Sequence, residues 1–397
     1  MSYFLPPEFH AQAAVLMAWP ASHTDWHDML PEAELNFAHI IINIRRTTQV
    51  LLLVPNQAVQ MQACQCIESL LELDYASITP TQLLPLSYSI LAYDDTWTRD
   101  YGPICVIRNQ TQLHTQPLTA LGNEKISTSI NSTNNSTNNS TNNSNMPEYI
   151  LHNFVFNGWG NKFNAANDNG VNQQLWASKA LQKLYSNTLK QTQPPNMRLE
   201  NHQLVLEGGS IETNGQGVML VTNQCLLNPN RNPGLSQATI EDQLKELFNV
   251  HTLLWLTQGD LEGDDTDAHI DTLARFVDAN TIVFQGCQNP ADVHYTSLNA
   301  MHQELEVWAH EYQFKLIELP LPTAQYHANQ RLPATYANFL ITHNNVLVPT
   351  YNCKEDALAI NILQQSLPEY IIIPIDCCAL IKNNGSLHCS TMQLPQT

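Results

Sequence analysis

The stretch Thr281-Ile282-Val283-Phe284, followed by helical periodicity over residues 297–312, contains the unit that decides the fold. A short apolar run is typical of a buried strand, and apolar residues at positions i, i+3 and i+4 are typical of an amphipathic helix. The same alternation recurs along the chain, and the last three expected helices begin at residues 239, 297 and 355, nearly sixty residues apart. A fixed interval favours repeats stacked radially or linearly over one open sheet.

The remaining elements are expected from the same two patterns. Strands are predicted at residues 50–54, 104–107, 218–221, 252–256, 281–284, 346–349 and 371–375. Helices are predicted at residues 33–48, 57–73, 171–186, 239–248, 297–312 and 355–366. A doubly wound sheet is the alternative, but no glycine-rich fingerprint follows the first strand. We therefore predict an α/β fold made of repeated units.

Composition narrows the classes of partner. The 397 residues carry a net charge of −19, with 36 acidic against 17 basic residues. Nucleic acids and anionic membranes are disfavoured, because phosphate contacts need clusters of Lys and Arg. No apolar run approaches the ~18 residues of a membrane span. The N-terminus shows no signal-peptide pattern, so the nine scattered cysteines are expected to be reduced thiols in a cytoplasm.

One segment differs from the rest. Residues at about 124–147 form a low-complexity insertion, in which Ser, Thr and Asn repeat over Ser127–Asn145. Such a segment cannot bury apolar surface, so we expect a disordered surface loop. The flanks, 113–121 and 149–156, are predicted to be neighbouring strands, which makes the insertion an expanded hairpin loop and not a linker between domains.

The motif Asp267-Ala268-His269-Ile270-Asp271 combines an imidazole with carboxylates. In an extended strand, His269 and Asp271 would share one face, where they could transfer protons and bind a cation. Solvated residues at a strand end are the alternative interpretation. A metal site is not expected, because no His pair at helical spacing and no Cys pair supports zinc.

Two further motifs carry acidic residues next to glycines. Trp97 and Asp100 lie in a stretch that ends at Pro103, and an aromatic wall with a carboxylate suits a planar cation. A structural salt link from Arg99 to an Asp is the alternative. Glu207 precedes two glycines that let the backbone approach another group closely, or else form an ordinary bulge with an exposed Glu.

Cys389 follows the strand-like segment Ser386–His388. Most isolated cysteines are small core residues, and this interpretation stays open from the sequence. The reactive form is the thiolate, and a guanidinium bound beside the sulfur would lower the pKa of the thiol from its usual ~8.5. Substrate binding would then activate the nucleophile.

Together these motifs resemble those of the agmatine deiminase family, within the guanidino-group modifying (pentein) superfamily. The resemblance covers nearly the whole chain apart from the insertion. Its blocks lie at residues 7–20, 25–26, 95–103, 156–160, 206–211, 225–233, 265–276, 336–339, 346–349 and 387–393.

The resemblance implies a five-bladed α/β propeller of ββαβ-type units, one domain over residues 1–397, with the site at its centre. It implies a hydrolase of polyamine biosynthesis that converts agmatine to N-carbamoylputrescine and ammonia through a covalent alkylthiouronium on Cys389, without cofactor or metal. His269 would be general acid and base. The remaining implied site residues are Asp100 and Asp271 as guanidinium clamp, Glu207 beside them, and Trp97 and Asp265 in substrate binding.

Departures from the family pattern leave the substrate open. Asn383 and Asn384 stand where the family usually has glycines, and Ser386 stands where it has Asn. Ala268 replaces Gly or Glu, and Asp265 replaces a Glu near the end that binds the substrate amine. Peptidyl-arginine or another small guanidino-amine is therefore an alternative substrate. A non-catalytic polyamine- or guanidine-binding protein, and assembly as a homo-oligomer, also stay open.

Overall fold

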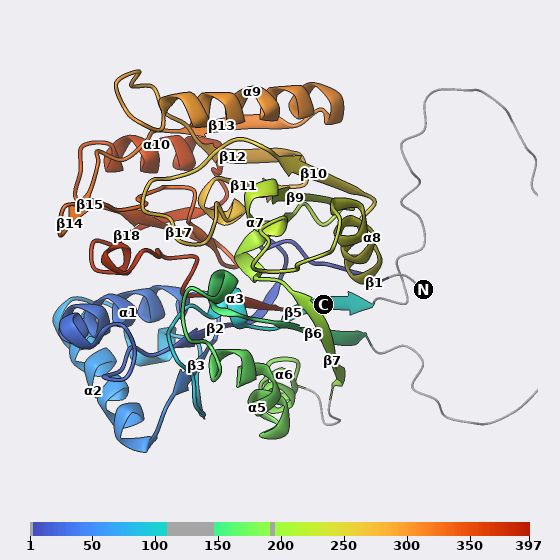
Figure 1. Ribbon diagram of the computed structural model, residues 1–397. Helices are drawn as coiled ribbons and strands as arrows, with labels where there is room; N and C mark the ends of the chain where they lie inside the picture. Colours follow the sequence, from blue (N-terminus) through green and yellow to red (C-terminus); the bar gives the residue numbers. More distant parts are fainter. Residues whose placement is uncertain (1–2, 109–146, 191–194) are drawn as a thin grey trace, which may run out of the picture.

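The apolar runs form small mixed sheets in the computed structural model, which describes residues 3–108, 147–190 and 195–397 (Figure 1). Within these ranges, five sheets have three or four strands, and each contains both an antiparallel and a parallel strand pair. The two four-stranded sheets have the strand orders β19 (Met392–Pro395), β2 (Gln12–Ala18), β3 (Val50–Val54), β4 (Leu86–Ile90) and β1 (Tyr3–Phe4), β5 (Ile104–Arg108), β6 (Glu148–Val155), β7 (Asn196–Val205). Two three-stranded sheets have the orders β10 (Thr252–Leu256), β9 (Val218–Thr222), β8 (Ile211–Thr213) and β11 (Ala274–Asp278), β12 (Thr281–Gln285), β13 (Lys315–Leu319). The third has the order β16 (Leu340–Ile341), β17 (Asn345–Thr350), β18 (Ile371–Asp376). A two-stranded hairpin, β14-β15 (Tyr326–His327, Gln330–Arg331), is separate.

Helices connect the parallel strands, as parallel pairing requires a crossover. The longer ones are α1 (Leu30–Ile44), α2 (Gln57–Leu73), α5 (Val171–Ala177), α6 (Ala180–Thr188), α8 (Gln237–Phe248), α9 (Tyr295–Tyr312) and α10 (Asp356–Ser366). In Figure 1, α1 and α2 lie at one side of the molecule and α9 and α10 at another. The predicted mixed α/β class is confirmed, and most predicted elements agree with the structure within a few residues.

Three predicted elements are wrong. The helix predicted at 171–186 is two helices, because Lys179 adopts φ +59° and breaks the hydrogen-bond ladder. Residues 267–271 are not a strand: Asp267 and Ala268 have φ of +66° and +60°, and a 3₁₀ turn, η5 (Ile270–Thr272), follows. The segment Ser386–His388 has no strand either, since β19 begins at Met392.

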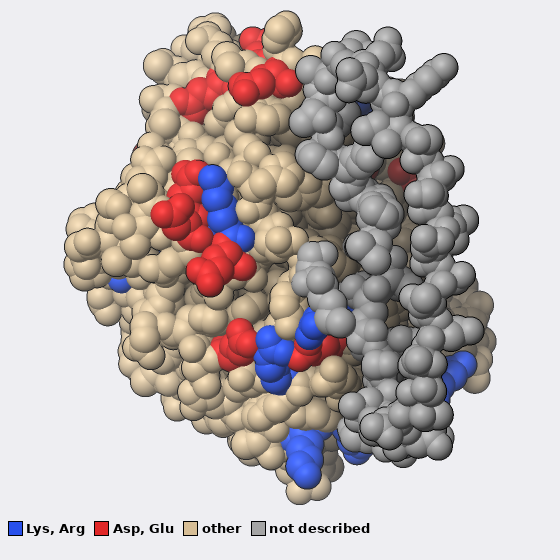
Figure 2. Space-filling model, turned by 90° about the vertical axis from the view of Figure 1, so that its right-hand side faces the viewer, with Lys and Arg blue, Asp and Glu red and all other residues tan. Residues whose placement is uncertain are grey.

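The predicted strand at 113–121 lies outside the described residues, and so does the predicted loop insertion except for residue 147. Their predicted partner strand, 149–156, forms β6, whose antiparallel neighbour is β5. On the described part of the face in Figure 2, some acidic and basic side chains lie next to one another, others form groups of one charge, and most of the surface is uncharged. Of the described helices, none is both long and apolar enough to span a membrane.

Candidate active site

Short turns from distant parts of the chain meet at one pocket. They are α3 (Thr98–Tyr101), η4 (Gly208–Ser210) and η5. The turn η4 contacts both α3 and η5, and the segment 387–391 lies beside α3. The pocket has a volume of about 230 Å³. Four predicted site residues line it: Trp97, Asp100, Asp265 and Cys389. The other three, Glu207, His269 and Asp271, are at most 1% exposed.

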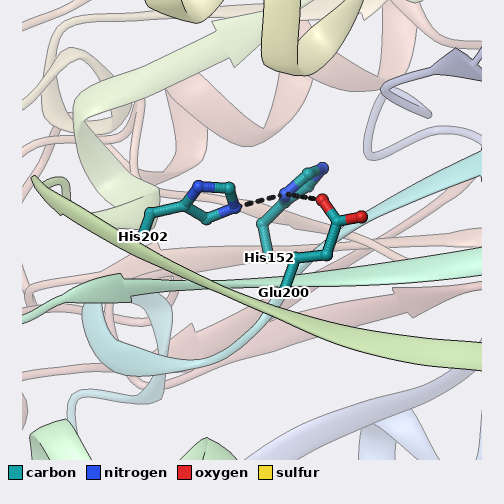
Figure 3. A group of neighbouring side chains, drawn as sticks. All are labelled: His152, Glu200 and His202. Carbon is teal, nitrogen blue, oxygen red and sulfur yellow. Dashed lines mark hydrogen bonds and ion pairs between the residues drawn. The ribbon is translucent and has the colours of Figure 1, made fainter.

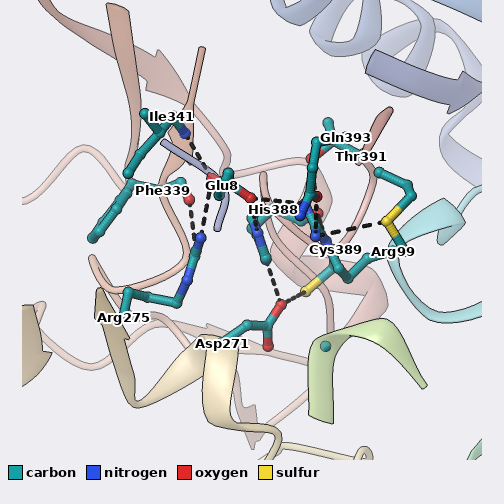
Figure 4. Close-up of polar contacts among 12 residues, drawn as sticks. Glu8, Arg99, Asp271, Arg275, Phe339, Ile341, His388, Cys389, Thr391 and Gln393 are labelled. Carbon is teal, nitrogen blue, oxygen red and sulfur yellow. Dashed lines mark hydrogen bonds and ion pairs between the residues drawn. The ribbon is translucent and has the colours of Figure 1, made fainter. Parts of the chain in front are cut away.

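Cys389 is close to a carboxylate at this pocket. Its Sγ lies 3.9 Å from Asp271 Oδ2 (Figure 4). The same Sγ accepts a hydrogen bond from Asn338 Nδ2 at 3.3 Å. Burial, with the negative charges of Asp271 and Asp100, raises the pKa of Cys389 well above its usual value. The free thiol is therefore protonated, and a cation placed beside it would favour the thiolate.

Asp100 and His269 form a buried pair. His269 Nδ1 lies 3.5 Å from Asp100 Oδ1, which also accepts from the backbone N–H of Gly209 at 3.1 Å. The other oxygen, Oδ2, accepts from Trp159 Nε1 at 3.0 Å. Burial raises the pKa of Asp100 to about 6, although the His269 charge opposes the shift.

His269 is surrounded by groups that favour its charged form. Its ring nitrogen, Glu207 and Cys225 offer atoms that all lie within 4.8 Å of one another. Burial disfavours the imidazolium, but Asp100, Cys225 and Glu207 outweigh it and raise the pKa of His269 well above its usual value. His269 can therefore donate a proton at neutral pH.

Glu207 is not the exposed residue of a glycine bulge. It is fully buried, and its Oε1 accepts from Arg231 Nε at 2.8 Å. Its Oε2 has no partner among the described residues. Arg99 does not form the alternative salt link to an Asp among the described residues. Its Nη2 pairs instead with Glu8 Oε2 at 3.0 Å.

Two glycines make room for the site. A Cβ on Gly209 would lie 2.7 Å from His269 Nδ1, 2.8 Å from Asp100 Oδ1 and 3.2 Å from Asp271 Oδ2. These distances show that Gly209 lies between the three ionisable groups. A Cβ on Gly385 would overlap the Trp97 ring, so this glycine lets the indole pack against the loop.

Asp265 and the asparagines that replace family glycines lie at the same pocket. Asp265 Oδ2 accepts from Asn384 Nδ2 at 3.3 Å, and burial with the charge of Asp264 raises the pKa of Asp265 to about 6. Asn384 has φ +61°, a conformation that Asn tolerates. Ala268 has φ +60°, where glycine would be less strained.

A second cluster carries metal-type ligands away from the pocket. His152 pairs with Glu200 in the sheet register, and Glu200 shares a strand face with His202 (Figure 3). His152 Nδ1 lies 2.7 Å from His202 Nε2, and Glu200 accepts from Arg198 Nε at 2.7 Å. Burial and His202 lower the pKa of His152 to about 4.

The structure thus brings all seven predicted site residues to one place, and adds residues to which the sequence argument gave no role. These are Asn338, Trp159, Arg231, Cys225 and His388. Each lies in a block that carried the resemblance, but an Asn, a Trp or a second His has no distinctive spacing that predicts a role.

Comparisons with known proteins give matches over nearly the whole chain. A sequence profile of the Porphyromonas-type peptidyl-arginine deiminase family matches residues 4–395. A Vibrio parahaemolyticus protein named "Putative agmatine deiminase" is 28% identical, and the match covers 99% of this chain and 97% of that protein. A C. jejuni agmatine deiminase, a cysteine-to-serine variant with substrate bound, has a similar structure, with TM-score 0.78, 31% identity and coverage of 100% and 97%. The "Putative Arginine Deiminase" structure from Porphyromonas gingivalis gives TM-score 0.77, 37% identity and coverage of 100% and 99%.

Proposed function

The chain belongs to the Porphyromonas-type peptidyl-arginine deiminase family, and on this premise we propose that it is an agmatine deiminase. It hydrolyses the guanidinium of agmatine to N-carbamoylputrescine and ammonia. The observation that carries the proposal is the meeting of a thiol, an imidazole and carboxylates at one pocket: Cys389 beside Asp271, and His269 beside Asp100.

The first step is the binding of the guanidinium. Asp100 and Asp271 are positioned to accept its N–H groups, and Asp271 Oδ1 has no other partner among the described residues. The bound positive charge lowers the pKa of Cys389, whose proton is released. Substrate binding therefore produces the nucleophile.

The chemistry then uses Cys389 and His269 in turn. The thiolate adds to the guanidinium carbon, and the imidazolium of His269 gives a proton to one nitrogen, which leaves as ammonia. The alkylthiouronium formed on Cys389 is attacked by water, whose proton returns to His269. The C–S bond breaks, the remaining O–H proton passes to the leaving sulfur and restores the Cys389 thiol, and the product is the ureido compound. The proton first released from Cys389 converts the ammonia to ammonium.

The pocket favours agmatine over free arginine. Besides Asp265, its lining includes Asp25, Asp94 and Asp95. These acids suit the ammonium end of agmatine and repel the α-carboxylate of arginine. An arginine side chain within a peptide has no such carboxylate, so peptidyl-arginine is the second candidate.

We also propose an architecture and a cellular location for the chain. The five mixed sheets, each with a parallel and an antiparallel pair, are the blades of one five-bladed α/β propeller that forms a single deiminase domain. The nine free cysteines support a cytoplasmic location.

The test is turnover by the full-length protein. We expect ammonia and ureido product from agmatine, little from free arginine or an arginine peptide, and none from Cys389→Ala. Agmatine left intact by the wild-type protein would contradict the proposal, and preference for the arginine peptide would select the second candidate.

A further inference from the structure

His388 lies between two buried carboxylates from distant parts of the chain. Its Nε2 lies 2.6 Å from Glu8 Oε2, and its Nδ1 lies 2.7 Å from Asp271 Oδ2 (Figure 4). All three side chains are at most 3% exposed, so water cannot replace either partner. The chain continues directly into Cys389, which places this bridge next to the reactive sulfur.

Two carboxylate contacts require two N–H donors. An ionised carboxylate only accepts hydrogen bonds, and a neutral imidazole has one N–H and one lone pair. One of the two contacts would then set a lone pair against a carboxylate oxygen. Burial opposes ionisation of both acids, but the charges of His388 and Arg275 hold the pKa of Glu8 and of Asp271 below its usual range. The geometry therefore fits the imidazolium.

The charges of the residues linked to His388 also favour its imidazolium form. Glu8 also pairs with Arg99 at 3.0 Å and with Arg275 at 3.0 Å, and Arg275 pairs with Glu212 at 2.5 Å. With Asp271, this bonded group contains three acids and two arginines. It therefore carries one uncompensated negative charge, which a charged His388 neutralises. The ionisable groups that contact His388 or act on it electrostatically are Glu8, Asp271 and Glu212. Arg99 and Arg275 pair with Glu8, and Cys389 is the next residue in the chain, whereas His269 pairs with Asp100.

On the basis of the proposed function, we infer that His388, held as an imidazolium, is a positioning residue for Asp271. It fixes Oδ2 of Asp271, to which Asn338 Nδ2 also donates at 3.3 Å, and leaves Oδ1 for the guanidinium. It also keeps Asp271 ionised before substrate arrives. Glu8 anchors the other face of the ring, which gives the N-terminal segment a part in the site.

The matched variants His388→Asn and His388→Gln separate its two roles. An Asn amide nitrogen can take the place of Nδ1 and still donate to Asp271, whereas a Gln amide nitrogen takes the place of Nε2 and reaches Glu8 instead. Both lose the positive charge. We expect kcat/KM for agmatine to fall roughly 10- to 100-fold in His388→Gln and less in His388→Asn, as for loss of a hydrogen bond to a charged group.

The pH profile shows whether the role is only structural. Without the imidazolium the pKa of Asp271 rises toward that of Asp100, so two carboxylates instead of one titrate on the acid limb, and kcat/KM should fall more steeply with decreasing pH in both variants than in the wild type. Variants with wild-type melting temperatures, equal losses at every pH and an acid limb as shallow as that of the wild type would overturn the inference.

A measurement without substrate tests the charge itself. In full-length protein labelled with ¹⁵N-histidine, both ring nitrogens of His388 should carry a proton at pH 7, as its two carboxylate contacts require. Its signal is assigned by its absence from whichever His388 variant folds. A neutral ring at pH 7 would refute the inference, even if the wild-type protein did not turn over agmatine.

Discussion

Asp100 is the residue whose protonation should limit the reaction in acid. The clamp needs its ionised form, and burial raises its pKa to about 6. As pH falls through this value, the free enzyme loses the carboxylate. We predict that kcat/KM for agmatine, which reports the free enzyme, falls about tenfold per pH unit below about 6.

Asp265 also has a pKa raised to about 6, so it is the matched control. Asp265→Asn should raise KM for agmatine but leave the acid limb in place. If the limb vanished in this variant, or if wild-type kcat/KM stayed flat to about pH 4.5, Asp100 would not be the group that titrates.

Individual residues of the site were predictable where their chemistry is distinctive. A thiol, a histidine and acids in separate motifs indicated attack on a positively charged carbon, and the structure places all of them together. Asn338 and His388 were not predicted, because their roles depend on contacts with Cys389 and Asp271 that only the fold creates.

At the scale of elements, the site depends on how closely α3, η4 and η5 approach one another. Gly209 of η4 lies where a methyl group would press on His269, Asp100 and Asp271 at 2.7–3.2 Å. Gly209→Ala should therefore lower kcat/KM by roughly 100-fold or more, since displacements of about 1 Å have such effects.

A matched control is Gly170→Ala. A Cβ there meets nothing nearer than Gln174 Nε2 at 3.6 Å, so activity should stay at the wild-type level. Full activity in Gly209→Ala would show that the three turns are less tightly packed than their distances indicate.

Strands and long helices were predictable because their apolar periodicity is local. The segment 267–271 was not, because alternation alone suggested a strand. Instead Asp264 Oδ2 accepts from the N–H of Ala268 at 2.6 Å, and Thr266 Oγ1 accepts from the N–H of His269 at 3.2 Å. These polar contacts hold a tight loop with two positive φ values.

At the scale of the whole molecule, the fold brings residues from both terminal segments of the chain into one buried group beside the pocket. Glu8, Asp100, Asp271 and Cys389 come from segments that are far apart in sequence, and β19 near the C-terminus pairs with β2. The recurring strand–helix interval predicted repeated units, but not which segments would meet.

The covalent step on Cys389 is the central claim, and mass spectrometry of the protein quenched during turnover of agmatine tests it directly. We predict that the peptide containing Cys389 gains the mass of agmatine less one ammonia, and that Cys389→Ala shows neither adduct nor product. Turnover by Cys389→Ala, or an adduct on another residue, would contradict the account.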